Sequence, residues 1–397
     1  MNIFNRLESN VRGYCRSFPV VFTRALGAML YDEQGREYID FLAGAGTLNY
    51  GHNNPLIKPK LLEFFAKDAV MHGLDLHTSA KRDLLETFDR LILRPRKLPY
   101  KVQFTGPTGT NAVEAAMKLA RAVTGRSNIV AFTNAFHGVT LGSAAATGNA
   151  YFREACGTPL GNVTFVPFDG YMGPDVDTVA YLRKLLTDKS SGLDFPAAVL
   201  VETVQGEGGV NVAGLSWLRE LAELCHEMEI LLIVDDIQVG CGRTGPFFSF
   251  EPARIVPDIV VLSKSLGAYG LPLSVVLMRS EIDQWKPGQH NGTFRGNNLA
   301  FVAAAEALRA YWSTDALSAE VESKGRIIRA SLEKIRSRFP DSDLAVRGRG
   351  LVWRQYLCAL GAARVEHARQ AVFRTQLVPL GQIYGHAGQV HGGATRE

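Results

Sequence analysis

The chain has 397 residues, with 43 lysines and arginines against 39 aspartates and glutamates, so its formal net charge is only +4. This near balance argues against a protein whose main task is to neutralise a nucleic-acid backbone. With 46% hydrophobic residues the chain can bury a large core, and its length predicts two or three folded units.

No segment is typical of a secreted or membrane protein. Residues 1–16 lack the apolar core of a secretory signal, and no run approaches the roughly 18 apolar residues that a membrane helix needs. The five cysteines include no Cys-x-x-Cys pair, a pattern typical of reduced thiols in a core. We therefore expect a cytoplasmic protein without a membrane or nucleic-acid partner.

Short apolar runs rich in β-branched residues alternate with helix-period segments through the middle of the chain. This alternation predicts βαβ units around a mainly parallel sheet, and thus an α/β fold. The expected strands are 128–132, 163–168, 197–202, 231–236, 258–263 and 274–278. Between two of them, residues 215–228 repeat apolar side chains every three or four positions, as an amphipathic helix does.

The two ends of the chain differ from its centre. Residues 26–44 predict two short antiparallel strands around a tight turn, and the chain becomes helical again after Asn298. We therefore expect a large domain over 49–298 and a smaller α+β domain built from both termini, 1–48 and 299–397.

Two of the expected strands end in side chains that can do chemistry. In open α/β sheets, ligands bind beyond the carboxyl ends of the strands. The strand over 231–236 includes Asp235 at its end, and the strand over 258–263 leads directly into Lys264. Burial lowers the pKa of a lysine and makes it a nucleophile toward an aldehyde. Taken singly, Lys264 could equally begin an exposed loop and Asp235 could cap a helix.

Residues 101–121 predict a short strand, a glycine-bearing turn and a helix. Gly109 and Thr110 lie at the start of that helix, where free N–H groups and the positive end of the helix dipole favour a phosphate. The turn lacks the Gly-Lys-Ser/Thr ending of a nucleoside-triphosphate loop and the glycine spacing of a dinucleotide site. It is therefore a generic phosphate cup, and an ordinary capped turn explains the segment equally well.

Phe136 and His137 follow the strand over 128–132, where an aromatic ring could stack on a flat cofactor or simply join the core. No cluster has the spacing of a metal site, and no serine has the context of a hydrolase nucleophile. Pyridoxal phosphate needs a phosphate anchor, a stacking group, a carboxylate for its ring nitrogen and a lysine for its aldehyde. The residues above supply all four.

The motifs around these residues resemble those of the class III, ornithine/4-aminobutyrate type, aminotransferases of pyridoxal-phosphate fold type I. The resemblance runs from about residue 10 to residue 353, with the motifs in family order. The motifs are FLAGAGTLNYGHNNP (41–55), GPTGTNAVEAA (106–116), FTNAFHGVT (132–140), ETVQGEGG (202–209), IVDDIQVGCGRTG (233–245), SKS with GLP (263–272) and NGTFRGNN (291–298).

The resemblance implies a role at the cofactor for each residue of the expected site. Lys264 would bind the cofactor's aldehyde and then carry a proton between substrate and cofactor, while Asp235 would keep the ring nitrogen protonated. Gln238 would hydrogen-bond the ring's phenolic oxygen. Phe136, with His137 beside it, would cover one face of the ring.

The resemblance also implies that Gly109 and Thr110 hold the phosphate. In this family the threonine of the NGTFRGNN-like segment, here Thr293, reaches the phosphate of the other subunit, which implies a homodimer. Glu207 matches a position that faces the substrate and can pair with an arginine. Val139 stands where some relatives place a substrate-binding arginine, so the residue that binds the substrate carboxylates stays open.

The sequence departs from the family after about Trp353. The segment GRGLVW (348–353) matches, but residues 354–397 show neither the expected strand alternation nor the closing segment that ends in a Pro-Leu pair. One hypothesis is a shifted reading frame after about residue 353, and the other is a genuine lineage-specific tail.

The resemblance implies a specific reaction. Asp236 departs from the Asp-Glu pair common in the class and agrees with its diaminobutyrate-forming members. These transfer the amino group of glutamate to aspartate 4-semialdehyde in two ping-pong half-reactions, for ectoine or some siderophores. The first alternative is another ω-amino-acid aminotransferase, and the second is a protein that keeps the fold but is inactive through its altered tail. The only feature that favours nucleic-acid binding is the small positive net charge of the chain.

Overall fold

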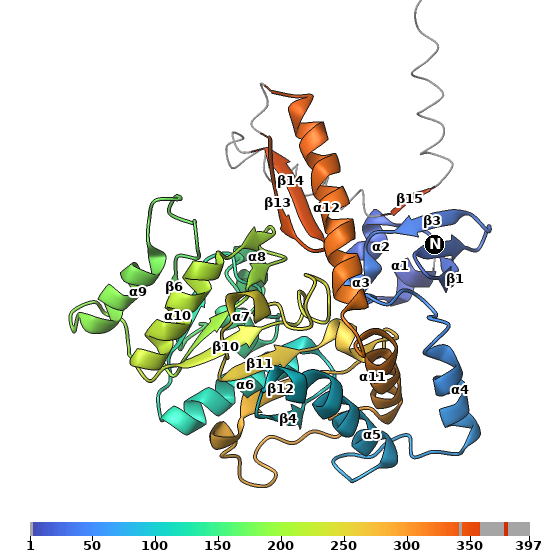
Figure 1. The fold of residues 1–397 in the computed structure, drawn as a ribbon, viewed down its shortest axis with the longest axis horizontal. Coiled ribbons are helices and arrows are strands. Elements are labelled where there is room, and N and C mark those ends of the chain that lie inside the picture. Colours follow the sequence, from blue (N-terminus) through green and yellow to red (C-terminus); the bar gives the residue numbers. More distant parts are fainter. Residues whose placement is uncertain (1–2, 341–343, 358–376, 380–397) are drawn as a thin grey trace, which may run out of the picture.

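The computed structural model describes residues 3–340, 344–357 and 377–379, and its centre is a seven-stranded sheet (Figure 1). The strand order is β4-β12-β11-β10-β7-β5-β6. The strands are β4 (Tyr100–Phe104), β5 (Ile129–Phe132), β6 (Val163–Val166), β7 (Ala198–Val201), β10 (Leu231–Asp235), β11 (Ile259–Leu262) and β12 (Val275–Arg279). All the strands expected in the centre of the chain are therefore present, close to their predicted bounds.

One strand of this sheet runs against its neighbours. β5, β6, β7, β10 and β11 pair in parallel, whereas β12 is antiparallel to both β11 and β4. Between β11 and β12 the chain forms only a short 3-10 turn, Lys264–Gly267. Parallel neighbours need a long crossover, usually a helix, so this short connection returns the chain antiparallel. The predicted mainly parallel sheet is confirmed, with β12 as its exception.

The predicted helix over 215–228 is confirmed as α10, and the helical region after Asn298 as α11 and α12. The helices are α1 (Ile3–Leu7), α2 (Tyr14–Ser17), α3 (Ala43–Gly46), α4 (Lys58–Ala66), α5 (Ser79–Phe88), α6 (Gly109–Thr124), α7 (Leu141–Ala146), α8 (Ala150–Glu154), α9 (Thr178–Thr187), α10 (Leu215–Glu227), α11 (Asn298–Tyr311) and α12 (Ala316–Ser337).

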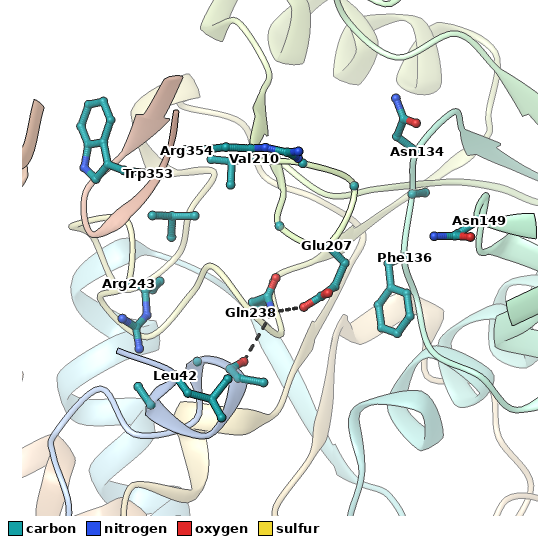
Figure 2. A pocket seen from close by; sticks show the side chains of 18 of the residues that line it. Leu42, Asn134, Phe136, Asn149, Glu207, Val210, Gln238, Arg243, Trp353 and Arg354 are labelled. Carbon is teal, nitrogen blue, oxygen red and sulfur yellow. Dashed lines mark hydrogen bonds between the residues drawn. The ribbon is translucent and has the colours of Figure 1, made fainter. Parts of the chain in front are cut away.

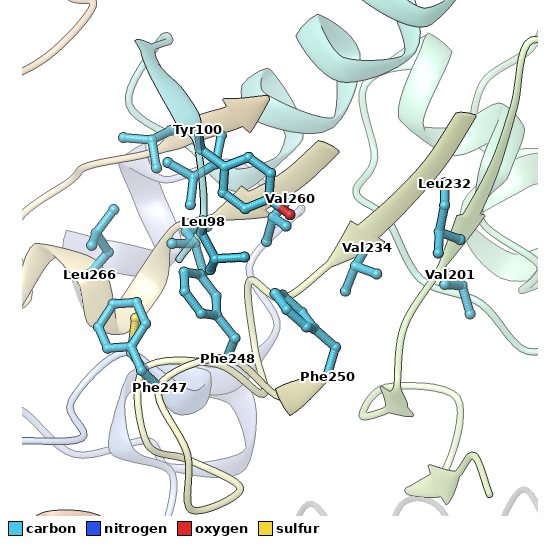
Figure 3. Packing of buried hydrophobic residues seen from close by; sticks show 14 of the residues in the cluster. Leu98, Tyr100, Val201, Leu232, Val234, Phe247, Phe248, Phe250, Val260 and Leu266 are labelled. Atoms are coloured by element: carbon cyan, nitrogen blue, oxygen red, sulfur yellow. The ribbon is translucent and has the colours of Figure 1, made fainter. Parts of the chain in front are cut away.

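Alternate residues along the strands pack on opposite faces of the sheet. On one face Leu200 and Ile233 are buried together with the alanine-rich side of α6. On the other face Val201 and Val234 belong to a larger cluster that includes residues of α10 and α11 and the aromatic ring of Phe248 (Figure 3). Burial on both faces explains why these strands are continuous apolar runs in the sequence.

A second sheet is antiparallel and contains β1 (Phe22–Leu26), β2 (Met29–Asp32), β3 (Glu37–Asp40) and β15 (Leu377–Pro379). The two short strands predicted over 26–44 are confirmed as β2 and β3, while β1 was not predicted. Asp32 fixes the turn between them, because its Oδ1 accepts the backbone N–H groups of Gln34 at 3.0 Å and Arg36 at 2.9 Å. Two further short strands, β8 (Val204–Gln205) and β9 (Asn211–Val212), form a hairpin.

Helix α12 and the hairpin of β13 (Leu344–Arg349) and β14 (Val352–Leu357) project from the central sheet at the top of Figure 1. The hairpin turn has Gly350 at φ 59°, and a Cβ there would lie 2.5 Å from Cα of Thr244. Glycine is therefore required where the hairpin touches the loop that follows β10.

The hairpin also bears on the predicted departure after Trp353. The chain continues as strand β14 through Leu357, although no strand alternation is visible in the sequence there. Their backbone pairs with β13, which the residue pattern alone does not reveal. Most of the predicted tail, 358–376 and 380–397, lies outside the described residues.

Hydroxyl groups join two loops at the carboxyl edge of the central sheet. The hydroxyl oxygens of Thr105 and Ser274 lie 2.6 Å apart, and Ser274 donates to the carbonyl oxygen of Gly106 at 2.6 Å. Ser263 donates its hydroxyl to the carbonyl oxygen of Leu273 at 2.9 Å. Because β12 is antiparallel, it begins at the edge where β4 and β11 end. These bonds therefore tie the loop before α6 to the loop after β11.

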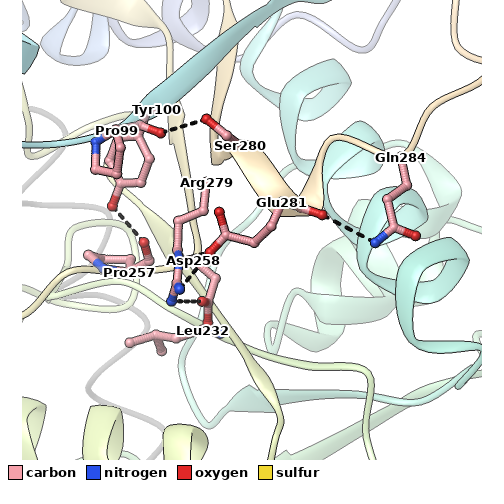
Figure 4. Close-up of polar contacts among 9 residues, drawn as sticks. All are labelled: Pro99, Tyr100, Leu232, Pro257, Asp258, Arg279, Ser280, Glu281 and Gln284. Carbon is pink, nitrogen blue, oxygen red and sulfur yellow. Dashed lines mark hydrogen bonds and ion pairs between the residues drawn. The ribbon is translucent and has the colours of Figure 1, made fainter.

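The opposite edge of the sheet is closed by polar contacts (Figure 4). Asp258 accepts the backbone N–H of Leu232 at 2.8 Å and Nη1 of Arg279 at 3.0 Å. Tyr100 donates its hydroxyl to the carbonyl oxygen of Pro257 at 2.6 Å. These contacts join the starts of β4, β10 and β11 to the end of β12, and they leave the carboxyl edge as the open one.

All cysteines in the described part of the chain are free thiols. Cys225 and Cys241 are buried, as predicted, and Cys156 is half-buried. The core prediction was wrong for Cys15, which is exposed because it lies on α2, a helix that buries none of its residues. Cys358 lies outside the described residues. Among the helices that the structure describes, none is long and apolar enough to cross a membrane.

Candidate active site

A cavity of about 760 Å³ opens at the carboxyl edge of the central sheet (Figure 2). Its lining residues come from segments far apart in the sequence. These segments lie around Phe41, Phe136, Asn149, Glu207, Gln238 and Trp353. Three residues of the predicted site, Phe136, Glu207 and Gln238, therefore face one cavity.

Lys264 follows β11, as predicted, with φ 47° in the left-handed region. The next residue, Ser265, donates its hydroxyl to the carbonyl oxygen of Gly46 at 2.8 Å, which holds this turn against the N-terminal segment. Burial lowers the pKa of Lys264, the charge of Arg243 lowers it further, and nearby carboxylates including that of Asp235 oppose the shift. A lowered pKa supplies the neutral amine that reacts with an aldehyde.

Asp235, the last residue of β10, is 5% exposed and contacts the buried imidazole of His137. Its Oδ2 lies 2.7 Å from Nδ1 of His137, and its Oδ1 accepts the backbone N–H of Ile237 at 3.2 Å. Burial disfavours a charge on His137, but the hydrogen bond and charge of Asp235 outweigh it and raise the pKa of His137. The structure thus places His137 against Asp235, where it orients the carboxylate.

Glu202 is a buried carboxyl group in the same cluster, and the sequence pattern gave it no role. Its Oε2 accepts the backbone N–H of Phe136 at 3.0 Å, which fixes the start of the aromatic segment. Burial raises the pKa of Glu202 to about 8, with Asp235 acting in the same direction and His137 opposing it. The sequence feature that could have pointed to Glu202 is its place as an acid at the end of the apolar run 197–202.

We expect Glu202→Gln to weaken the pH dependence of stability. From an ordinary pKa of 4.5, burial raises the pKa of Glu202 to about 8, so only the folded chain keeps this proton between those values. Stability therefore falls as the pH rises through this window. Glutamine stays neutral and still offers an oxygen to Phe136. Urea unfolding at about pH 5 and about pH 8 should show a smaller fall in unfolding free energy for the variant.

The exposed Glu223→Gln provides the matched control, because it removes the same charge from the surface of α10. Its unfolding free energy should follow that of the parent protein at both pH values. An equal fall in the parent protein and in Glu202→Gln would contradict a buried, protonated Glu202.

The start of α6 lies at the same edge of the sheet, in a tight arrangement that depends on glycine. A Cβ at Gly109 would lie 2.9 Å from Cδ1 of Ile237, and one at Gly138 would lie 2.6 Å from Oγ1 of Thr110. The hydroxyl groups of Thr110 and Thr140 lie 2.6 Å apart. The predicted phosphate cup is therefore packed between the loops that follow β5 and β10.

Gln238 and Glu207 are joined inside the cavity, as Figure 2 shows. Nε2 of Gln238 donates to Oε1 of Glu207 at 3.0 Å and to the carbonyl oxygen of Ala45 at 3.4 Å. Both N–H groups of this amide are engaged, so the predicted bond to a cofactor oxygen requires one of these contacts to open. Phe136 packs its ring against that of Phe152, with 5.4 Å between the ring centroids.

Thr293 lies apart from this cluster. It is exposed in the segment before α11, and it does not line the cavity of its own chain. Gly109, Thr110, Asp235 and Lys264 are likewise absent from the residues that line the cavity.

Two arginines line the cavity although the sequence pattern did not single them out. Arg243 comes from the loop after β10, and Arg354 comes from β14. The available signal for Arg243 was its place in the motif 233–245, shortly after Asp235. Tyr14 also lines the cavity, and nothing in its surrounding sequence predicted this.

The residues present fit pyridoxal phosphate. A half-buried lysine of lowered pKa and a buried aspartate close two paired strands, β11 and β10, and a glycine-dependent helix start adjoins them. These groups match the aldehyde, the ring nitrogen and the phosphate of that cofactor. In the part of the chain that the structure describes, no group of three or more His, Cys, Asp or Glu could hold a metal ion.

Known proteins resemble the chain over most of its length. Diaminobutyrate–2-oxoglutarate transaminase of Bordetella parapertussis is 65% identical over 352 residues, which are 89% of this chain and 81% of that protein. The protein of the same name from Halomonas elongata is 62% identical over 353 residues, 88% of this chain and 84% of that protein.

Solved structures share the fold. The ornithine aminotransferase of Toxoplasma gondii ME49 superposes with a TM-score of 0.77 at 28% identity, covering 89% of this chain and 80% of that one. An S-selective transaminase from Arthrobacter sp. has a TM-score of 0.81 at 24% identity and covers 90% of this chain and 81% of its own. A family model described as aminotransferase class-III matches residues 12–359, which include the whole cavity, and the chain belongs to the class III aminotransferases.

Proposed function

We propose that the chain transfers the amino group of L-glutamate to L-aspartate 4-semialdehyde, giving L-2,4-diaminobutyrate and 2-oxoglutarate. The observation that carries the proposal is that the half-buried Lys264 and the Asp235–His137 contact follow the ends of two adjacent strands. The substrates follow from the name shared by relatives that are 65% and 62% identical to the chain.

Pyridoxal 5′-phosphate is the cofactor, and when bound it supplies an aldehyde and an electron-withdrawing ring. Lys264 would hold the aldehyde and could take and return a proton at its Nζ. Asp235, oriented by His137, would hold a proton on the ring nitrogen, and Phe136 would pack against the ring and exclude water there. In two successive half-reactions the same side chains handle glutamate and then the semialdehyde.

We expect the purified protein, loaded with cofactor, to convert 2,4-diaminobutyrate and 2-oxoglutarate into glutamate faster than it converts ornithine or 4-aminobutyrate. The reason is that the chain is 65% identical to a relative named for diaminobutyrate, but only 28% identical to the ornithine aminotransferase of T. gondii. A coupled assay for glutamate with each amino donor measures this. Turnover of ornithine or 4-aminobutyrate without diaminobutyrate would favour another ω-amino-acid aminotransferase. A folded, cofactor-loaded protein inactive with all three would favour an inactive form.

The active form is a homodimer in this proposal, with Thr293 of one chain at the phosphate held by Gly109 and Thr110 of the other. Exposed apolar side chains near Thr293 support a protein contact there. In the neighbouring segments these are Val70, Met71, Leu74, Leu76 and Phe294. The ring of Phe294 packs edge-on against that of His72, with 5.3 Å between centroids, which joins the two segments. Light scattering of the purified protein tests the dimer.

The remaining assignments follow the same proposal. The separate antiparallel sheet of β1, β2 and β3 supports a small-domain segment over 1–48, with 49–298 as the large domain and 299–397 completing the small one. We place the enzyme in the cytoplasm, making diaminobutyrate for ectoine or for siderophores. Neighbouring ectoine genes would favour the first use. Sequencing of the encoding DNA decides between a shifted frame and a genuine tail after residue 353.

A further inference from the structure

A chain of hydrogen bonds joins the first turns of α6 to the loop that follows β5. The hydroxyl oxygens of Thr110 and Thr140 lie 2.6 Å apart, and Thr140 donates its hydroxyl to Oε1 of Glu114 at 2.6 Å. The same Oε1 accepts the backbone N–H of Ser143 at 3.1 Å. Thr110 and Glu114 are four residues apart on α6 and so share one face of the helix. Glu114 therefore reaches Thr110 through Thr140.

The direction of donation along this chain follows from the number of protons in it. An ionised carboxylate only accepts hydrogen bonds, and a threonine hydroxyl has a single proton to donate. The proton of Thr140 points to Glu114, so the proton between Thr140 and Thr110 comes from Thr110. The hydroxyl of Thr110 has its proton engaged in this way, and it offers only an acceptor to the predicted phosphate cup.

This arrangement has the wrong polarity for a phosphate, whose oxygens are acceptors too. If Thr110 donates to a phosphate oxygen, Thr140 must turn its own proton toward Thr110. The oxygens of Thr140 and Glu114 then face each other with no proton between them, which is unfavourable. The negative charge of Glu114 also repels a phosphate in the cup. Glu114 therefore opposes donation from Thr110 to a phosphate.

The packing around the chain leaves it little room to relax. A Cβ at Gly142 would clash with the carboxylate of Glu114, and one at Gly138 would lie 2.6 Å from Oγ1 of Thr110. Ser143 donates its hydroxyl to the carbonyl oxygen of Thr110 at 3.4 Å, which adds a further link between the loop and α6. The side chains are thus held close together, and the direction of donation changes only if a proton moves.

We propose that Glu114 is a positioning residue that sets the direction of donation at Thr110 and thereby limits the affinity of the site for the cofactor's phosphate. This proposal rests on the proposed function, which places the phosphate at Gly109 and Thr110. Other residues handle the ring and the aldehyde, so Glu114 acts on the phosphate end alone. By weakening that end, Glu114 keeps the binding of pyridoxal phosphate reversible.

The experiment compares the full-length parent protein with Glu114→Gln, using pyridoxal 5′-phosphate and pyridoxal, which lacks the phosphate, as probes. The amide of glutamine can donate to Thr140, so the protons of Thr140 and Thr110 can both point toward the phosphate. The Kd for pyridoxal 5′-phosphate should fall roughly 3- to 30-fold, whereas that for pyridoxal should change by less than about twofold. Absorbance titration with each probe measures both constants.

Thr140→Val tests whether Glu114 acts through Thr140. Valine cannot accept from Thr110, so the proton of Thr110 is released, and the Kd for pyridoxal 5′-phosphate should fall here as well. In the variant with both substitutions the two gains should not add, because each removes the same link. Glu223→Gln, at an exposed glutamate of α10, is the matched control and should bind both probes as the parent protein does.

A purely structural role for Glu114 predicts the opposite sign, because a loosened loop would weaken the binding of pyridoxal 5′-phosphate. Weaker or unchanged binding by a folded Glu114→Gln would therefore overturn the proposal, as would gains that add fully in the double variant. If Glu114→Gln does not fold, Thr140→Val carries the test alone, and parent-like binding by it overturns the proposal.

Two further results separate this proposal from the proposed function. A protein that shows the expected gain in Glu114→Gln but does not convert diaminobutyrate would refute the proposed function and support the role of Glu114. A parent protein that converts diaminobutyrate, but whose affinity for pyridoxal 5′-phosphate is insensitive to both substitutions, would refute the role of Glu114 and leave the proposed function intact.

Discussion

Lys264→Ala should lower the rate of transamination by at least about 10²- to 10⁴-fold and abolish the absorbance of covalently bound cofactor. In the proposed function, the variant removes both the amine that would bind the aldehyde and the group that would move the proton. Burial lowers the pKa of Lys264, which means that burying the charged amine is unfavourable. Its removal should therefore leave the fold intact. Absorbance spectra and single-turnover kinetics with diaminobutyrate measure these effects.

Lys184→Ala is the control for this prediction, because Lys184 is an exposed lysine of α9. It should keep both the absorbance and the rate. Added methylamine should restore part of the rate to Lys264→Ala, since a free amine can replace the missing proton carrier. A Lys264→Ala protein with parent-like turnover would show that the amine beyond β11 is not the reacting group.

Two substitutions of Asp235 should separate catalysis from stability. Asp235→Ala leaves the buried His137 without its acceptor, which costs about 1–3 kcal/mol of unfolding free energy. Asp235→Asn keeps an oxygen for His137 and should lose less stability. Both variants lack the negative charge that would hold a proton on the ring nitrogen in the proposed function, so both should lose at least about 10²-fold in kcat.

Urea denaturation and steady-state kinetics measure these two effects separately. Asp175→Asn, at an exposed aspartate remote in sequence from the site, is the matched control and should change neither. If Asp235→Asn keeps a parent-like kcat, the negative charge of Asp235 does not have the role proposed for it in catalysis, even if the substitution lowers stability.

The sequence predicted much of the fold, because burial on both faces leaves a direct mark on it. Strands such as β7 and β10 are continuous apolar runs, and the polar residues that close them mark the edge where ligands bind. That rule predicts Asp235 and Lys264 at one edge of the sheet. The direction of β12 was not predicted, since an apolar run has the same composition whichever way it points.

The parts of the site that the sequence did not predict depend on how loops return to the sheet. The contact between His137 and Asp235 needs the path of the chain after β5, which no periodicity encodes. Glu202 gains its contact with the Phe136 backbone through the same loop. Arg243 faces the cavity only because the loop after β10 folds back on itself and is met by the hairpin of β13 and β14.

The hydroxyl contacts among Thr105, Ser274 and Gly106 have a dynamic consequence. Local opening in a folded protein breaks hydrogen bonds in cooperative units. Here the chain just before α6, where we propose that the phosphate binds, and the chain around Lys264 are joined by such bonds at the start of β12. Neither loop can fluctuate open alone, so the two ends of the cofactor site should exchange their amide hydrogens together, as one slowly opening unit.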